Sequence, residues 1–178
     1  MFSFLKKSQN VKERIELPPV EVDGEKEILG SPMEGEIISC GEIRDLTFQK
    51  EMLGTTVAIK PTVGKVYAPA DGTINMMIES LHVVSMTTEQ GTEILIHVGI
   101  DTVALKGKYF KGYVKEGESV KRGDLLISFD ITGIEGAGYE MVSPVIICNT
   151  EEYETIERVD RTTIKVGETI MKLQKTAI

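Results

Sequence analysis

The sequence contains two histidines, His82 and His97, and imidazole is a competent nucleophile and proton carrier near neutral pH. His97 stands in ILIHVGIDT, residues 94–102, where strand alternation places His97 and Leu95 on one face. The opposite face carries Ile94, Ile96, Val98 and Ile100. Gly99 shares the face of His97 and marks either a bulge or the close approach of another molecule. A single histidine in such a place is more often an ordinary surface residue than a functional one.

The second histidine changes this interpretation. His82 stands in INMMIESLHVVSM, residues 74–86, which has strand-like character and places Ser80 on the same face as the ring. If this segment and residues 94–102 are neighbouring strands joined by the polar turn TTEQGT, residues 87–92, both imidazoles face one spot. The spacing permits this arrangement, and we then expect the rings to meet in a shallow, solvent-exposed depression.

Composition limits the classes of function. The chain of 178 residues is long enough for one domain with an ample core, and its hydrophobic content of 41% is ordinary for a globular protein. Its formal net charge of -8 argues against nucleic acid as a partner, and either attracts a basic protein or simply keeps the chain soluble. Cys40 and Cys148 form no CxxC pair and are interpreted as reduced thiols without a chemical role.

Residues 1–27 are interpreted as a flexible N-terminal tail and linker, followed by a folded domain at 28–178. The first stretch, MFSFLKKSQNVKERIEL, is too short and too charged to span a bilayer, and it lacks the long apolar region of a secretory signal. Two alternatives stay open for it: a frayed tail, or an interfacial helix in weak contact with a membrane surface. The predicted location is cytoplasmic.

The elements that must position the histidines are predicted to be strands. From Ile28 onward, short apolar alternations are broken by Gly, Pro, Asp and Asn at intervals of roughly eight to twelve residues. This pattern predicts an all-β fold with little helix, an antiparallel β-sandwich and barrel-like hybrid. The exception is EYETIERV, residues 152–159, for which we expect one or two helical turns.

The sequence also contains an internal repeat. SPMEGEI, residues 31–37, resembles APADGTI, residues 68–74, and VKEGESVKRGDLLISFD, residues 114–130, resembles IKVGETIMKL, residues 164–173. We expect each repeated glycine to occupy a tight turn that needs a positive φ. The repeat predicts a pseudo-symmetric pair of sheets.

Similar motifs occur in biotinyl and lipoyl carrier domains, which offer a competing function. Those domains present a modified lysine at a hairpin tip, whereas Met171-Lys172-Leu173 has no second half of a domain after it. This disfavours the carrier hypothesis. Zinc endopeptidases of similar β architecture need at least three protein ligands, and two histidines are too few for their motifs.

These segments together resemble the glucose-type enzyme IIA proteins of the bacterial phosphoenolpyruvate-dependent sugar phosphotransferase system. The resemblance covers about residues 28–175. It rests on DLTFQKEMLGTTVAIKPTVGKVYAPADGTI (45–74), ESLH (79–82), ILIHVGIDTVALKGKYF (94–110), EGESVKRGD (116–124), SPVIICN (143–149) and VGETIMKL (166–173). The run HVGIDTVALKG with an upstream histidine is the most specific part.

The resemblance implies the residues of the site. His97 matches the phosphorylated histidine of the family, His82 its second active-site histidine, and Ser80 the usual threonine that hydrogen-bonds the second ring. Asp45 and Asp101 match acidic residues at the edge of the site. An apolar collar for docking protein partners is implied at Phe48, Met52, Leu53, Ile78 and Leu95, where the family often has aromatic residues at the last two places.

The resemblance implies a phosphocarrier that takes a phosphoryl group on His97 from the histidine phosphocarrier protein HPr and passes it to the IIB domain of a sugar permease. A phosphoramidate on imidazole keeps a high transfer potential, so this relay needs no cofactor and no metal. Two imidazoles bind zinc only if a partner adds ligands. The alternative is a regulatory binding module of the same fold that acts on other protein targets.

Overall fold

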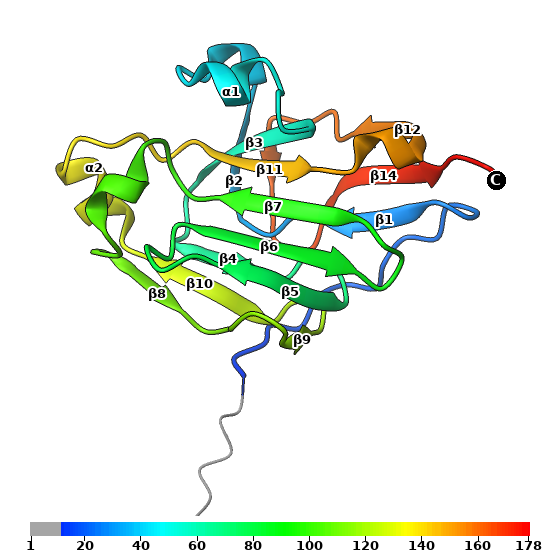
Figure 1. Ribbon diagram of the computed structural model, residues 1–178, viewed down its shortest axis with the longest axis horizontal. Coiled ribbons are helices and arrows are strands. Elements are labelled where there is room, and N and C mark those ends of the chain that lie inside the picture. Colours follow the sequence, from blue (N-terminus) through cyan, green and yellow to red (C-terminus); the bar gives the residue numbers. More distant parts are fainter. Residues whose placement is uncertain (1–11) are drawn as a thin grey trace, which may run out of the picture.

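The computed structural model describes residues 12–178, and its regular structure is mostly antiparallel strand (Figure 1). The strands are β1 (Glu27–Gly30), β2 (Gly35–Ile38), β3 (Thr55–Pro61), β4 (Lys65–Tyr67), β5 (Gly72–Met77), β6 (Val83–Thr88), β7 (Glu93–His97), β8 (Phe110–Gly112), β9 (Ser119–Val120), β10 (Leu125–Phe129), β11 (Ser143–Ile147), β12 (Tyr153–Arg158), β13 (Thr163–Ile164) and β14 (Thr169–Lys175). The helical elements are η1 (Cys40–Glu42), α1 (Leu46–Gln49), η2 (Thr102–Leu105), α2 (Ile131–Gly136) and η3 (Thr150–Glu152). The predicted all-β fold with little helix is confirmed.

The strands form three sheets around one core. An eight-stranded sheet has the order β13-β2-β3-β11-β7-β6-β5-β9, and two three-stranded sheets have the orders β1-β14-β12 and β4-β10-β8. Ile59, Ile96, Leu126 and Ile170 are fully buried members of one apolar cluster that draws on all three sheets. Each such side chain stabilises the fold by about 1.5–3 kcal/mol relative to exposure, so alternation in the sequence fixes which face of each strand is inward.

The predicted repeat corresponds to a pseudo-two-fold relation between two halves. Ser31 exchanges backbone hydrogen bonds with the Gly167–Glu168 turn, and Ala68 exchanges the same pair with the Gly123–Asp124 turn. The β1–β14 and β4–β10 pairings repeat in register, each with an irregularity beside the pair nearest the closing turn, at Leu29/Gly30 and at Leu125/Ile127. Each half therefore contains one such strand pair and one turn, Gly123–Asp124 or Gly167–Glu168, that closes it.

The axis of this relation passes between the two central strands of the large sheet. Ile96 of β7 pairs with Val145 of β11, while β6 and β3 flank them at matching register. His97 and Ile146, one residue beyond that pair on each strand, consequently occupy equivalent positions. One half carries an imidazole where the other carries an aliphatic side chain.

The alignment of the second repeat is different from the predicted one. The turn that matches IKVGE, residues 164–168, is VKRGD, residues 120–124, rather than VKEGE at 114–118. In both matching turns an acidic side chain accepts a hydrogen bond from a lysine amide, Asp124 from Lys121 and Glu168 from Lys165. The two candidate segments both contain glycine and lysine at suitable spacing, so only the hydrogen bonds distinguish them.

The predicted reason for two of the repeated glycines is also wrong. Gly123 and Gly167 have positive φ, as expected, but Gly35 and Gly72 do not. They begin β2 and β5, where a Cβ atom would lie 2.1 Å from the carbonyl oxygen of Lys60 and 2.2 Å from that of Thr87. Close approach of the neighbouring strand, and not turn geometry, therefore requires glycine at both places.

The helical turns predicted at residues 152–159 are wrong except at the first residue, which ends η3. Residues 153–158 are the edge strand β12, which pairs with β14 and buries Tyr153. Its aromatic and β-branched residues, Tyr153, Thr155 and Ile156, favour strand, and pairing with β14 outweighs the helix-like spacing of the charges.

The residues before β1 lie along the body of the protein. This N-terminal arm, residues 12–26, forms an isolated β-bridge and an ion pair between Arg14 and Asp124. Leu17 packs against Gly167, where added side-chain atoms would clash. The arm crosses the closing turns of both halves.

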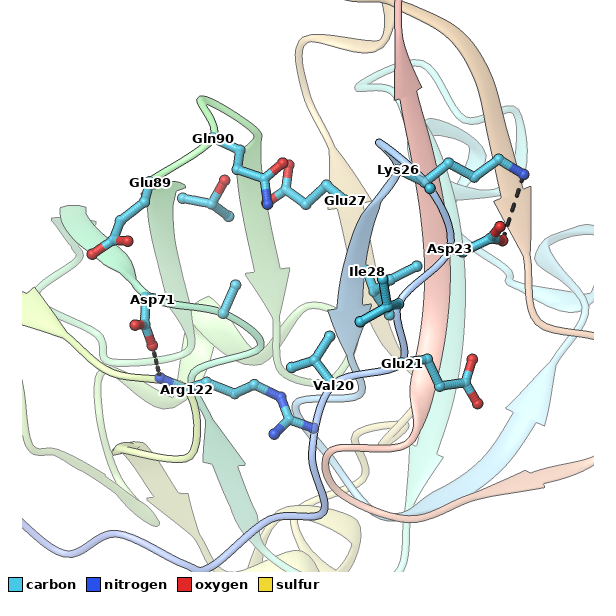
Figure 2. A pocket seen from close by; sticks show the side chains of 14 residues that line it. Val20, Glu21, Asp23, Lys26, Glu27, Ile28, Asp71, Glu89, Gln90 and Arg122 are labelled. Carbon is cyan, nitrogen blue, oxygen red and sulfur yellow. Dashed lines mark hydrogen bonds and ion pairs between the residues drawn. The ribbon is translucent and has the colours of Figure 1, made fainter.

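A pocket of about 400 Å³ lies between residues 20–28 and the turns that contain Asp71 and Glu89 (Figure 2). The backbone N–H of Arg122 donates to the carboxylate of Asp71 at 2.8 Å, and its guanidinium donates to the carbonyl of Pro18 at 2.9 Å. Neither histidine lines this pocket. We interpret it as the seam between arm and body.

Candidate functional site

One side of the site is formed by the connection between β2 and β3, residues 39–54, which we call the covering segment. It contains η1 and α1 and lies at the top of Figure 1. Asp45 begins α1, because its carboxylate accepts hydrogen bonds from the backbone N–H groups of Thr47 and Phe48. Phe48 and Ile43 pack with Ile146 in a second apolar cluster, on the face of the large sheet opposite the main core.

The other side is the much shorter connection between β5 and β6, residues 78–82. It was predicted to be strand, but it is a tight turn in which the N–H of Leu81 donates to the carbonyl of Ile78, with Leu81 at φ +59. Ser80 and His82 therefore meet because of the turn and not because of strand alternation. The Ser80 hydroxyl lies 2.9 Å from Nδ1 of His82.

His97 is the last residue of β7, and the loop after it holds its ring. Nδ1 lies 2.7 Å from the carbonyl oxygen of Gly99, so this nitrogen carries the proton and donates it. The lone pair is consequently on Nε2. Gly99 has φ +73, and a Cβ atom there would lie 2.6 Å from the methyl group of Thr102 and 2.9 Å from the carbonyl oxygen of Glu140.

The two imidazoles meet across the β6–β7 hairpin, as the sequence predicts. Their ring centroids are 4.8 Å apart, with the rings nearly perpendicular. The N–H of Val98 donates to the carbonyl of His82 at 2.7 Å, which ties the turn to the loop after β7. The expected open depression is only partly correct, because His97 is half-buried and His82 is 3% exposed.

Burial affects the protonation state of the two imidazoles. It lowers the pKa of His82 to about 4, with a further contribution from His97 nearby. Burial also lowers the pKa of His97, while the Gly99 carbonyl and the carboxylates of Asp45 and Asp101 oppose this shift. Both rings are therefore neutral at pH 7, the state in which imidazole is nucleophilic.

The predicted docking residues differ widely in exposure. Met52 is 69% exposed and Leu53 is also exposed, whereas Ile78 and Leu95 are half-buried. Phe48 is buried, and its ring centroid is 4.9 Å from that of His97. Phe48 is thus a wall of the site, and the exposed apolar atoms of the collar come mostly from the end of the covering segment.

Sequence reasoning missed two exposed apolar residues near the acidic pair. Leu46 follows Asp45, and Val103 lies two residues after Asp101; both are largely exposed. Each is an apolar residue at or near the start of a helical turn, and nothing in the sequence indicated that it packs in the core. That combination was the signal that could have identified them.

The site offers few ligands for a metal. The two imidazoles supply two nitrogens, and among residues 12–178 no three His, Cys, Asp or Glu side chains are grouped to hold an ion. No helix in the same part of the chain has the length and apolar character that crossing a membrane requires.

The chain was compared with known proteins. Residues 27–153 match the family "phosphoenolpyruvate-dependent sugar phosphotransferase system, EIIA 1". A glucose-specific EIIA component of Oceanobacillus iheyensis is 40% identical over 138 residues, which are 78% of this chain and 84% of that protein. The glucose permease IIA from Mycoplasma capricolum has a similar structure, with a TM-score of 0.78 and 30% identity over 84% of this chain and 96% of that one.

Longer proteins are similar as well. A beta-glucoside-specific EIIBCA component of Dickeya chrysanthemi is 44% identical over 133 residues, which are 75% of this chain but 21% of that protein. The chain spans about a quarter or less of the length of such EIIBCA relatives.

Proposed function

Because this chain belongs to the EIIA 1 family of the phosphoenolpyruvate-dependent sugar phosphotransferase system, we propose that His97 is the residue that carries the phosphoryl group. The hydrogen bond from Nδ1 of His97 to the Gly99 carbonyl is the observation that carries this proposal. It leaves the Nε2 lone pair as the nucleophile, in a neutral ring beside a second imidazole.

The transfer is a simple exchange of bonds. Nε2 of His97 attacks the phosphorus of a phosphohistidine on the donor, a new N–P bond forms, and the donor nitrogen keeps the electron pair of the bond that breaks. A second exchange of the same kind then passes the phosphoryl group from His97 to an acceptor. Exposed apolar side chains such as Met52 and Leu53 would exclude water at each interface.

His82 and Ser80 support this step. A proton donated by the Ser80 hydroxyl to Nδ1 of His82 leaves the Nε2–H of that ring as a donor to the phosphoryl oxygens on His97. His82 is neutral before transfer, since its pKa is about 4. The negative charge of a bound phosphoryl group raises that pKa, so the ring becomes a better hydrogen-bond donor as the group arrives.

The partners are proposed on the same basis. HPr is the donor and the IIB domain of a sugar permease is the acceptor, and both meet the protein in the cytoplasm. Relatives named EIIBCA components are similar to this chain over part of their length. A carrier role for Lys172 is disfavoured, because this residue lies within β14 and pairs with Asp23 at 3.2 Å instead of standing at a hairpin tip.

The first test is mass spectrometry after incubation with phosphoenolpyruvate, the general phosphotransferase enzyme and HPr. We expect one phosphoryl group per chain, labile in acid and located on the peptide that contains His97. Phosphate on another residue would overturn the assignment. Binding of partners without any phosphate uptake would favour the regulatory module.

The second test separates the roles of the histidines. His82→Gln keeps a hydrogen-bond donor but cannot become cationic, so uptake from HPr should survive at least in part while donation to a IIB domain falls further. The two half-reactions are measured separately with labelled phosphate. Equal losses in both directions would contradict this division of roles.

A further inference from the structure

The loop after His97, residues 98–102, is held by hydrogen bonds from several elements. Its bonds are Val98 N–H to the His82 carbonyl at 2.7 Å, Gly99 N–H to Ser143 Oγ at 3.0 Å, Ile100 N–H to the Glu140 carbonyl at 2.9 Å, and Thr102 Oγ1 to the Val98 carbonyl at 2.5 Å. Of these, only the bond to Ser143 uses a side chain from outside the loop. It is therefore the one external anchor that a substitution can remove.

The Ser143 hydroxyl is placed to act as an acceptor. Ser143 begins β11, pairs in register with Ile59 of β3, and is 0% exposed. Its own proton goes to the carbonyl oxygen of Met141 at 2.7 Å. With the proton directed there, a lone pair of Oγ faces the N–H of Gly99, and solvent has no access to replace it.

We propose that Ser143 is a positioning residue that selects the reactive tautomer of His97, an inference that rests on the proposed function. Oγ of Ser143 holds the Gly99 N–H, and the Gly99 carbonyl holds the Nδ1 proton of His97. Gly99 is the hinge between these two bonds. The Gly99 N–H belongs to the peptide unit before this residue, and its carbonyl belongs to the unit after it, whose Ile100 N–H donates to the Glu140 carbonyl. Because a glycine at positive φ has wide rotational freedom, both units must be held for the carbonyl to keep its direction, and Ser143 holds the first of them.

Loss of the anchor acts on the chemistry through the tautomer. If the Gly99 carbonyl turns away, Nδ1 of His97 loses its acceptor, and the proton can sit on either ring nitrogen. A ring with the proton on Nε2 has no lone pair facing His82 and cannot take the phosphoryl group there. The fraction of His97 rings in the reactive tautomer falls, and the ring is less well oriented for attack.

The experiment uses Ser143→Ala with Ser31→Ala as a matched control. Ser31 is also buried and also donates its hydroxyl proton to a carbonyl, that of Met33 at 2.7 Å, but it does not contact the loop after His97. The first readout is the pair of ring ¹⁵N chemical shifts of His97 at neutral pH in the free protein. The second is the rate of phosphate uptake from phosphorylated HPr.

We expect Ser143→Ala to change the His97 tautomer and to slow uptake roughly 10- to 100-fold, as misplaced reacting groups do. Ser31→Ala should lose stability while both readouts stay as in the unchanged protein. Ser143→Thr, which keeps the hydroxyl, should restore both. Ser143→Cys, whose thiol is a weaker hydrogen-bond acceptor, replaces the alanine variant if that one does not fold, with losses in the same direction. An unchanged tautomer and rate in Ser143→Ala, or equal losses in Ser31→Ala, would overturn the proposal.

The tautomer readout needs no phosphate, so it distinguishes this inference from the proposed function. If His97→Ala still took up phosphate, the proposed function would fail whatever the tautomer showed. If the tautomer of His97 shifted as expected but uptake did not slow, the positioning role of Ser143 would fail alone.

Discussion

The two halves of the large sheet share a scaffold and differ in what lies over their outer faces. In the covered half, β2, β3 and β11, residues 39–54 pack on the sheet and bury Ile146 completely. In the open half, β5, β6 and β7, the equivalent connection is the short turn at 78–82, and the position equivalent to Ile146 is His97, which is half-buried. The proposed chemistry is thus located where the pseudo-symmetry is broken.

The boundary between the halves matters as much as the difference. Phe48 belongs to the covering segment, but its ring contacts His97 of the open half. The covering segment therefore stabilises one half and also supplies an apolar wall beside His97, whose pKa is lowered by burial. The open half alone would offer a solvated imidazole.

The most severe test of the comparison exchanges the equivalent residues for alanine. His97→Ala should abolish phosphate uptake completely, because the nucleophile is lost. Ile146→Ala should lower the free energy of unfolding by about 2–5 kcal/mol, because it leaves a cavity, yet still take up phosphate when folded. Uptake is followed with labelled phosphate and stability by urea titration. Label in His97→Ala would contradict the assignment of the halves.

Phe48→Ala should weaken the boundary. Removing the buried ring should lower the free energy of unfolding by about 3–5 kcal/mol and bring water to His97. Because burial lowers the pKa of His97, we expect this pKa to rise in the variant. An NMR titration measures it, with Met52→Ala, at an exposed position, as the control. A pKa that stays unchanged would show that the covering segment does not tune the open half.

Gly35 and Gly72 should respond alike, since they are equivalent and each lies against a backbone carbonyl. Alanine at either position should lower the free energy of unfolding by about 1–3 kcal/mol, through displacement of the neighbouring strand. Gly136→Ala is the control, because a Cβ atom there has open space. Unequal losses of unfolding free energy, measured by urea unfolding, would show that the two halves are less alike than their hydrogen bonds indicate.

Acid should destabilise the open half through His82. Its pKa is about 4 when folded and about 6.5 when unfolded, so the unfolded chain binds more protons as pH falls. Stability is therefore full above about pH 6.5 and is lost as pH falls toward 4, by about 2 kcal/mol between pH 7 and pH 5. His97, whose pKa is also lowered, adds in the same direction. His82→Gln should flatten the curve of unfolding free energy against pH.

The smallest effect on transfer is expected from the N-terminal arm, which crosses both halves but does not contact the histidines. We propose that the phosphocarrier domain is residues 28–178, so deletion of residues 1–26 should leave phosphate uptake intact. Loss of the contacts of Arg14 and Leu17 should lower the melting temperature. Thermal unfolding and the uptake assay check both parts, and loss of uptake in the folded deletion variant would move the boundary.

Local patterns in the sequence were sufficient for much of this site. Alternation placed His97 on the outer face, and the turn TTEQGT predicted the hairpin that brings His82 beside it. Both signals depend on neighbours along the chain, which sequence reasoning handles well.

What could not be predicted depends on residues far apart in sequence. Ser143, at the start of β11, accepts a hydrogen bond from the Gly99 N–H, and no spacing rule connects these two residues. The burial of His82 accompanies the turn at 78–82, where the spacing indicated a strand. The reason for Gly35 lies in the carbonyl of Lys60 on another strand. In each case the contact is set by tertiary packing, and the local sequence pattern does not predict it.

The pairing of β1 with β14 has a consequence for how the chain reaches this structure. Glu27 of β1 lies opposite Leu173 of β14. The β1–β14 pairing therefore cannot form until nearly the whole domain has left the ribosome. Closing so long a loop costs entropy before any contact compensates for it. We therefore expect folding to be slow for a domain of this size, with one edge of β14 paired to β12 and the other exposed and prone to aggregation until β1 joins it.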